Sequence, residues 1–197
     1  MLKVAKFGGS SVSDAKQFKK VKAIMESDSS RCIAVVSAAG KRSSDDHKLT
    51  DLLYLCHAHL TYGVSCDDIF ESIASRFIQI RDELGLSFRV EDDLENLKAR
   101  LNKDISVDEL VSRGEYLTSR LMAEYLGFHF LDAKDCIFMN YDGSFNAGKI
   151  SDAVQKAFNE NLIRETDVKT ILKLAKEANA LMDEYGALHI DAPEDEE

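Results

Sequence analysis

The sequence lacks several features that mark common classes of protein. Of its 197 residues 35 are acidic and 25 are basic, giving a net charge of −10, so we do not expect a nucleic acid or an anionic membrane as its main partner. No apolar run approaches the roughly 20 residues that a membrane-spanning helix needs. Because the chain enters a predicted strand at its third residue, we expect no signal peptide and a cytoplasmic protein.

Paired cysteines and metal-binding spacings are lacking as well. The four cysteines are scattered and form no C-x-x-C pair. Cys32 and Cys56 lie among apolar residues, which predicts buried thiols in a reducing compartment. The five histidines show no ligand spacing, since His57 and His59 would point to different faces of a helix. We therefore predict no metal site built by the protein itself.

What the sequence does have is a glycine loop after its first predicted strand. Residues 3–12 read KVAKFGGSSV, in which a short buried strand leads through a Gly-Gly turn to the start of a helix. N–H groups at such a start point outward at the positive end of the helix dipole and can bind phosphate. Lys6 would add a full positive charge beside them. An isolated pair of glycines is, however, more typical of a plain strand–helix turn.

A second strand is predicted to bring another small-residue loop beside the first. Cys32–Val36 is a continuous apolar run that predicts a strand buried on both faces. The intervening helix, capped by Ser13 or Asp14, makes the connection a right-handed parallel crossover and the class α/β. Because the carboxyl ends of parallel strands share one edge, the loops Gly8–Ser11 and Ser37–Gly40 should lie side by side.

Helical patterns occupy most of the remaining chain. We predict helices over residues 47–62, 67–84, 91–101, 106–126, 150–163 and 164–185, and short strands over 128–132 and 137–141. Thr50 falls in the first turn of its helix, where capping would explain it as well as ligand binding does. Gly114 lies inside a helix, where glycine costs about 1 kcal/mol relative to alanine. Either helix packing or the close approach of a ligand would account for it.

Four segments of the chain form a recognisable combination. They are KFGGSSV (residues 6–12), VVSAAGK (35–41), LTD (49–51) and SRGE (112–115), with FLDA (130–133) after them. Together they resemble the amino-terminal part of the aspartate kinases, of the amino-acid-kinase family. Over residues 1–163 the resemblance implies a three-layer αβα sandwich with a mostly parallel sheet, the amino-acid-kinase or carbamate-kinase-like fold, incomplete at its C-terminal side. Residues 164–186 would form an extra helix, and residues 187–197 an acidic tail.

The resemblance implies an ATP-dependent kinase that converts L-aspartate to 4-phospho-L-aspartate, the first step of the lysine, threonine and methionine branch of amino-acid biosynthesis. Mg²⁺, carried by the nucleotide, would bridge the phosphates. Lys6 would be the catalytic residue that neutralises the transferring phosphoryl group. The residues implied to bind the phosphates of ATP are Lys6, Phe7, Gly8, Gly9 and Ser10. Those implied to bind aspartate are Ser37, Ala38, Thr50 and Glu115, the last through the α-ammonium group.

Three hypotheses stay open, because the family patterns PGF, GRGGSD and WTDV do not occur in the sequence. The arginine expected to clamp the substrate carboxylate is missing together with these patterns, as is much of the nucleotide site. The first hypothesis is an aspartate kinase, represented by its substrate-binding portion. The second is a non-catalytic remnant or fusion that serves as a binding or oligomerisation module, and the third is another small-molecule kinase of the same fold. The expected partners are L-aspartate, ATP and a second copy of the chain.

Overall fold

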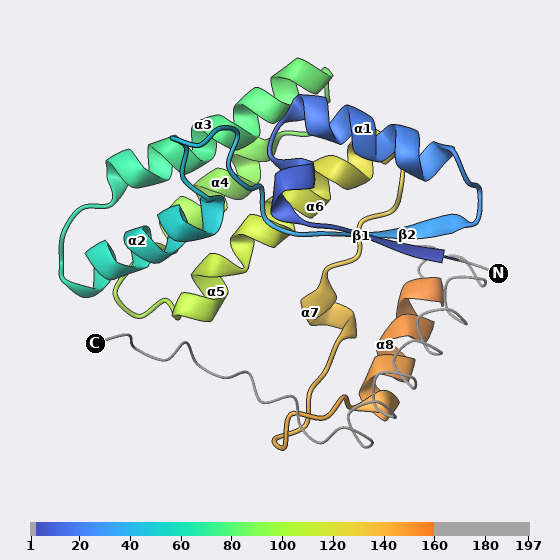
Figure 1. The fold of residues 1–197 in the computed structure, drawn as a ribbon. Coiled ribbons are helices and arrows are strands. Elements are labelled where there is room, and N and C mark those ends of the chain that lie inside the picture. Colours follow the sequence, from blue (N-terminus) through green and yellow to red (C-terminus); the bar gives the residue numbers. More distant parts are fainter. Residues whose placement is uncertain (1–2, 160–197) are drawn as a thin grey trace, which may run out of the picture. The chain divides into compact units, whose positions relative to one another are not determined.

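The computed structural model describes residues 3–159 of the chain, which divides into two compact units at Phe130/Leu131 (Figure 1). Each unit is described by itself. The elements of the first unit are β1 (Lys3–Phe7), the 3-10 turn η1 (Gly9–Val12), α1 (Ala15–Glu26), β2 (Arg31–Val36), α2 (Leu49–Thr61), α3 (Asp67–Leu84), α4 (Val90–Ala99), α5 (Val107–Val111) and α6 (Arg113–Leu126). Those of the second are α7 (Ala133–Cys136) and α8 (Ala147–Asn159).

The first unit is an α/β structure built on one parallel strand pair. β1 and β2 pair with Ala5 opposite Ala34 and Phe7 opposite Val36, which confirms the predicted parallel crossover. The helices of this unit gather on one side of the strands (Figure 1). Val35 is 48% exposed, so the prediction that the second strand is buried on both faces is wrong. Helices cover only one face of the strand pair within the first unit.

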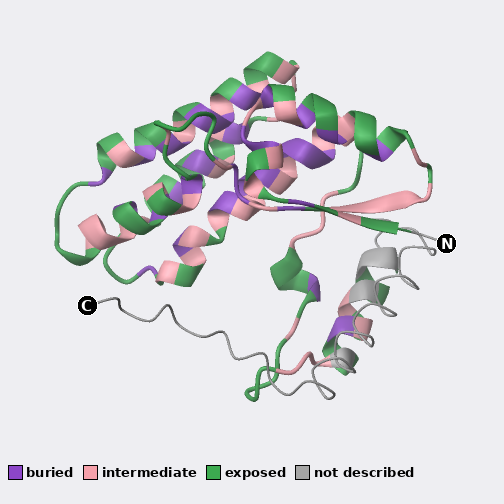
Figure 2. Ribbon diagram, viewed as in Figure 1, coloured by how far each residue is buried: buried purple, intermediate pink, exposed green. Residues whose placement is uncertain are grey.

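The core of this unit lies among α1, α2, α3, α4 and α6, whose apolar stripes face one another (Figure 2). Its largest fully buried side chains include Phe18, Phe77, Leu49, Leu110 and Leu121. Two predicted helix starts are confirmed. Asp14 accepts a hydrogen bond from the Gln17 amide at the start of α1, and Ser106 accepts one from the Glu109 amide at the start of α5.

The helix predicted over residues 106–126 is in fact two helices. α5 ends at Val111, and α6 begins at Arg113 after a turn residue, Ser112. The Ser112 hydroxyl donates to the carbonyl of Glu109 at 2.9 Å. Serine side chains that bond to the preceding turn bend helices, which accounts for a break that the apolar spacing did not reveal.

The sheet has fewer strands than predicted. Residues 128–132 form no ladder, and Asp132 instead caps α7 by accepting from the Lys134 amide. Residues 137–141 contribute only an isolated antiparallel bridge, Met139 to Phe145, around a turn at Gly143. The described architecture is therefore α/β with a small, two-stranded parallel sheet, and the predicted larger sheet is not formed in residues 3–159.

The last predicted elements fall partly or wholly beyond these residues. α8 covers Ala147–Asn159 where a helix over 150–163 was predicted. The helix over 164–185, its boundary at residue 163 and the acidic tail lie outside the described residues and stay predictions. No helix within residues 3–159 is both long and apolar enough to cross a membrane.

Candidate functional site

The glycine loop after β1 forms a short 3-10 turn. Gly8 occupies the N-cap position, and its carbonyl accepts a hydrogen bond from the Ser11 amide at 2.9 Å. The first N–H groups of such a turn, those of Gly9 and Ser10, have no partner inside it. α1 then starts separately, because Asp14 is extended and caps it. The N–H groups of the loop thus belong to a four-residue turn, whose dipole is smaller than that of a long helix.

The loop after β2 lies directly against the glycine loop. The Gly40 amide donates to the Gly9 carbonyl at 2.9 Å, and the Ser37 amide donates to the Phe7 carbonyl at 3.0 Å. A Cβ on Gly40 would lie 2.6 Å from the carbonyl carbon of Gly9, and a Cβ on Gly9 would lie 2.8 Å from the Ala38 oxygen. Because these neighbours are backbone atoms, both positions require glycine. The prediction that the two loops lie at the same edge of the strand pair is confirmed, and the structure shows in addition that they are in contact.

α2 begins at this same loop and places Thr50 beside it. The Leu49 amide donates to the Ala39 carbonyl at 3.3 Å, which ties the first turn of the helix to the loop. The N-cap residue is Lys48, which makes no side-chain cap bond, so Thr50 is not the cap. The half-buried Thr50 side chain makes no hydrogen bond with any other residue in the described range.

α6 packs its first turn on the loop from another side. Gly114 is buried, and a Cβ on it would lie 2.9 Å from the Ala38 Cβ and within 3.3 Å of the Leu49 and Leu53 side chains. Close helix packing therefore explains this glycine without a ligand. Glu115 follows it in the first turn of α6 and is half-buried. All four recognisable segments thus converge on Ser37–Gly40.

Lys6 and Glu115 carry the charges predicted to meet ligands. Lys6 is exposed near the carboxyl end of β1, in register with Val35 of β2. Within residues 3–159 neither its ammonium group nor the Glu115 carboxylate forms a hydrogen bond or an ion pair. A charged group that the protein leaves unpaired can form charge-assisted hydrogen bonds with a ligand of opposite sign. Lys6 suits an anion, and Glu115 suits a cation.

The other predicted site residues divide into buried and accessible ones. Phe7 is 8% exposed and Ala38 is 3% exposed, so their side chains belong to the core and only their backbones can face a ligand. Ser37 is half-buried, and Gly8 and Ser10 are exposed. A Cβ on Gly8 would meet no atom within 4 Å, and its φ of −74° suits any residue. The protein itself therefore does not require a glycine at this position.

Sequence reasoning missed a buried arginine that reaches the second loop from α3. Arg76 is 3% exposed, and its guanidinium donates to the carbonyl of Gly40 and, at 2.8 Å, to that of His47. The Asp46 carboxylate lies 3.6 Å from it. Burial lowers the pKa of Arg76. Hydrogen bonds from Arg42 hold the pKa of the Asp46 carboxyl well below its usual range.

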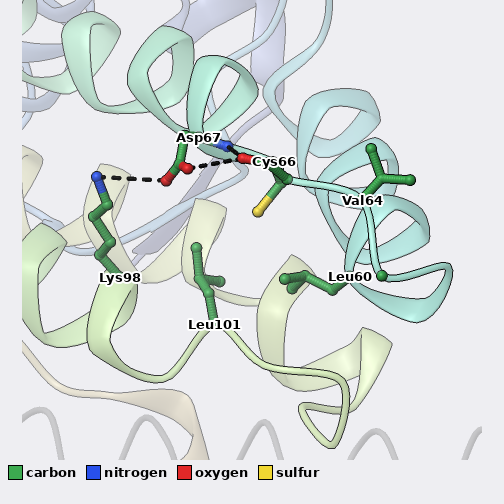
Figure 3. A pocket seen from close by; sticks show the side chains of 8 residues that line it. Leu60, Val64, Cys66, Asp67, Lys98 and Leu101 are labelled. Carbon is green, nitrogen blue, oxygen red and sulfur yellow. Dashed lines mark hydrogen bonds and ion pairs between the residues drawn. The ribbon is translucent and has the colours of Figure 1, made fainter.

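A hollow of about 400 Å³ lies at the far end of α2 (Figure 3). Leu60 and Leu101 line it, beside an ion pair of 3.7 Å between Lys98 and Asp67. Leu60 comes ten residues after Thr50, about 15 Å along the helix axis, so this hollow is separate from the loops. In the part of the chain that the structure describes, no three His, Cys, Asp or Glu side chains are grouped so that they could hold a metal ion.

Comparison with known proteins supplies the family. The model of the amino acid kinase family matches residues 1–181. Aspartokinase 3 of Bacillus subtilis (strain 168) is 30% identical over 177 residues, covering 84% of this chain and 38% of that protein. The crystal structure of Clostridium acetobutylicum aspartate kinase superposes with a TM-score of 0.74 at 42% identity, over 79% of this chain and 36% of that one.

A more distant likeness concerns the fold alone. The structure of E. coli aspartokinase III in complex with aspartate and ADP has a TM-score of 0.64 at 22% identity, over 82% of this chain and 38% of that one. The chain thus spans less than two fifths of the length of each of these relatives. Because the family model matches most of its length, the chain belongs to the amino acid kinase family.

Proposed function

We propose that this chain forms the amino-terminal part of an aspartate kinase. The proposed reaction is ATP-dependent phosphorylation of the side-chain carboxylate of L-aspartate to 4-phospho-L-aspartate, the first step of the lysine, threonine and methionine branch of amino-acid biosynthesis. The observation that carries the proposal is the convergence of the four segments on Ser37–Gly40 through backbone hydrogen bonds and close packing. Likeness to proteins named as aspartate kinases supports the substrate.

In this proposal the glycine loop receives the phosphates of ATP. The ammonium group of Lys6, which has no partner in the described part of the chain, neutralises the charge of the transferring phosphoryl group. The N–H groups of Gly9 and Ser10 donate to its oxygens. Gly8, where an added Cβ would meet no atom within 4 Å, lets a phosphate approach the backbone. Phe7 would contribute through its backbone, because its side chain is buried.

Aspartate would bind on the side of the loop formed by α2 and α6. The Glu115 carboxylate, which has no partner among residues 3–159, pairs with the α-ammonium group of the amino acid. The hydroxyl groups of Thr50 and Ser37, both half-buried, offer hydrogen bonds to its carboxylates. Ala38, buried under Gly114, would set the depth of this side of the site and offer only backbone atoms.

The nucleotide is proposed to bring its own Mg²⁺. The donor chemistry fits this, because the described residues include no acidic cluster that would hold the ion on its own, whereas phosphate oxygens are good Mg²⁺ ligands. Bound there, the ion would spread the charge of the phosphates. Lys6 then orients the terminal phosphate. We also propose that the complete domain is a three-layer αβα sandwich with a mostly parallel sheet, and that the protein is cytoplasmic.

A second candidate is a binding or oligomerisation module without catalysis. The observation that favours it is the face of the strand pair that no helix of the first unit covers, where Val4 is 37% and Val35 is 48% exposed. An apolar strand face of this kind commonly packs on another element or chain. Titration of the purified chain with ATP and with aspartate separates the readings, because a module of this class is expected to bind neither ligand.

The test of the proposed function is ligand binding by titration calorimetry, with magnesium present. Lys6→Ala should weaken ATP binding and Glu115→Gln should weaken aspartate binding. Each change should be about 1.5–3 kcal/mol, the range for hydrogen bonds to charged groups. Lys16→Ala, which removes an exposed lysine of α1, is the matched control and should leave both affinities unchanged.

Each substitution should affect the affinity for one ligand only. Glu115→Gln should leave ATP affinity nearly intact, and Lys6→Ala should leave aspartate affinity nearly intact. If the wild-type chain binds neither ligand, its function as an aspartate kinase portion is contradicted. If it binds both and Lys6→Ala matches the wild type, the assignment of Lys6 is wrong while the family and fold stand.

A further inference from the structure

Arg76 is a charged residue in a place where an apolar one would be expected. It lies on the inner face of α3, between Ile73 and Ile80, at 3% exposure. Moving a charge into a protein interior is unfavourable unless polar partners replace its water. Here the partners belong to one segment, residues 40–47, which joins the second loop to the start of α2.

The partners of Arg76 sit at the two ends of that segment. One guanidinium nitrogen donates to the Gly40 carbonyl and another donates to the His47 carbonyl at 2.8 Å. A planar guanidinium holds its donors in a fixed fork, so the two carbonyls are held at a set separation. α3 itself packs along α2 (Figure 1), which gives the fork a rigid base.

Both ends of the clamped segment touch the candidate site. The Gly40 amide donates to the Gly9 carbonyl at 2.9 Å, so the position of Gly40 sets the position of the glycine loop. At the other end His47 lies three residues before Thr50, and the Leu49 amide donates to the Ala39 carbonyl at 3.3 Å. A movement of either carbonyl would therefore change the distance between the phosphate loop and the aspartate-binding side.

A second layer of charge supports the clamp. Asp46 lies 3.6 Å from the Arg76 guanidinium and supplies its counter-charge. Arg42 donates to the same carboxylate from its side chain, at 2.8 and 3.0 Å, and from its backbone amide at 2.9 Å. The Arg76 Nε has no partner in the described residues, so the function of the side chain rests on its terminal nitrogens.

We propose that Arg76 is a positioning residue that holds the phosphate loop and the start of α2 in register for binding both ligands. The inference rests on the proposed function, since it concerns the geometry of that same site. Arg76 touches neither ligand in this view and acts through Gly40 and His47. A methionine could fill much the same volume but could not donate to either carbonyl.

The test compares Arg76→Met and Arg76→Lys with a matched arginine of the same helix. Arg81 also lies in α3 and makes charge-assisted bonds, but to Asp82 of the same helix and, at 2.6 and 2.9 Å, to Glu91 of α4. Two properties are measured on the full chain with magnesium: the affinities for ATP and aspartate, and amide hydrogen exchange at Gly40 and Leu49. Thermal unfolding of each variant is recorded alongside.

Arg76→Met is expected to weaken both ligands at least tenfold and to speed exchange at the two amides more than elsewhere. Arg76→Lys should recover part of both effects, and Arg81→Met should stay within twofold of wild type. The inference would be overturned if Arg76→Met bound both ligands with wild-type affinity. It would also be overturned if exchange in Arg76→Met rose uniformly along the chain while Arg76→Lys bound the ligands like wild type. If the wild-type chain binds neither ligand, the proposed function fails, and unchanged exchange at Gly40 and Leu49 in Arg76→Met would then refute the clamp independently.

Discussion

The two sides of the glycine loop have opposite surroundings. On the inner side Gly9 is pressed against the second loop, where an added Cβ would lie 2.8 Å from the Ala38 oxygen. On the outer side a Cβ added to Gly8 would meet no atom within 4 Å, and the charge of Lys6 nearby has no partner among residues 3–159. Packing of the protein therefore explains the inner glycine. It does not explain the outer glycine, whose proposed role is to leave room for a phosphate.

Substitution at the contact between the two loops should cause the largest loss of stability. In Gly40→Ala the new Cβ would lie 2.6 Å from the Gly9 carbonyl carbon and 2.8 Å from the Ser10 amide nitrogen. Since backbone must move to relieve this, the free energy of unfolding should fall by about 1–3 kcal/mol, the usual cost of overpacking. Urea unfolding at neutral pH measures it. A change below about 0.5 kcal/mol, typical of surface positions, would show that the loops are less tightly apposed.

A substitution where α6 packs on the second loop should lower the free energy of unfolding by less. A Cβ at position 114 would lie 2.9 Å from the Ala38 Cβ, but alanine also favours the helix by about 1 kcal/mol over glycine. Gly114→Ala should therefore destabilise by about 1 kcal/mol in the same urea assay.

A double-mutant cycle isolates the contact behind this loss. Ala38→Gly removes the opposing methyl group, so Gly114→Ala should be less harmful, or even stabilising, in the Ala38→Gly background. Purely additive effects of the two substitutions would locate the clash on Leu49 and Leu53 instead.

The stabilisation that Asp46 provides, in the segment that joins the second loop to α2, should depend on pH. The pKa of Asp46 is lower in the folded chain than its ordinary 3.8, chiefly because of hydrogen bonds from Arg42. A depressed carboxyl pKa stabilises the fold above the unfolded-state value, and this contribution is lost as the pH falls toward the folded-state value. Asp46→Asn should therefore cost up to about 1 kcal/mol at pH 7, as for a partly exposed ion pair.

The pH dependence of that difference is the decisive measurement. The gap in unfolding free energy between wild type and Asp46→Asn should be constant above about pH 5 and should narrow below about pH 4. A gap that persists unchanged at pH 3 would mean that the ionised carboxylate is not what stabilises residues 40–47.

Whether the sequence predicted a feature correctly depends on how far apart in the chain the interacting residues lie. The strand pair, the contact of the two loops and the Asp14 cap follow from local periodicity and from the parallel-sheet rule, and all are confirmed. The strand expected at 128–132 is not formed in the described residues, because an apolar run becomes a strand only where a partner strand is available. Propensity alone does not carry that information.

The sequence named residues for the candidate site, which stay predictions, but it did not reveal the contacts that support the site. Motif resemblance picked out Lys6, Thr50 and Glu115, while the reason for Gly114 stayed open until its neighbours were seen. Arg76 carried a signal, since it interrupts an apolar stripe between Ile73 and Ile80. Nothing local could say that its partners are carbonyls 29 and 36 residues earlier in the chain.

The outer side of the glycine loop provides the smallest change in stability and the sharpest test of the comparison. Gly8→Ala adds a methyl group where the structure has no neighbouring atom, at a φ of −74° that alanine adopts readily. The free energy of unfolding should therefore change by less than about 0.5 kcal/mol. A phosphate bound to the adjacent N–H groups would, however, meet this methyl group. Titration of the variant with ATP and magnesium should show an affinity at least tenfold below wild type, with aspartate affinity nearly unchanged. Equal ATP affinities would mean that the phosphate does not approach Gly8, and the contrast between the two glycines would then be one of packing alone.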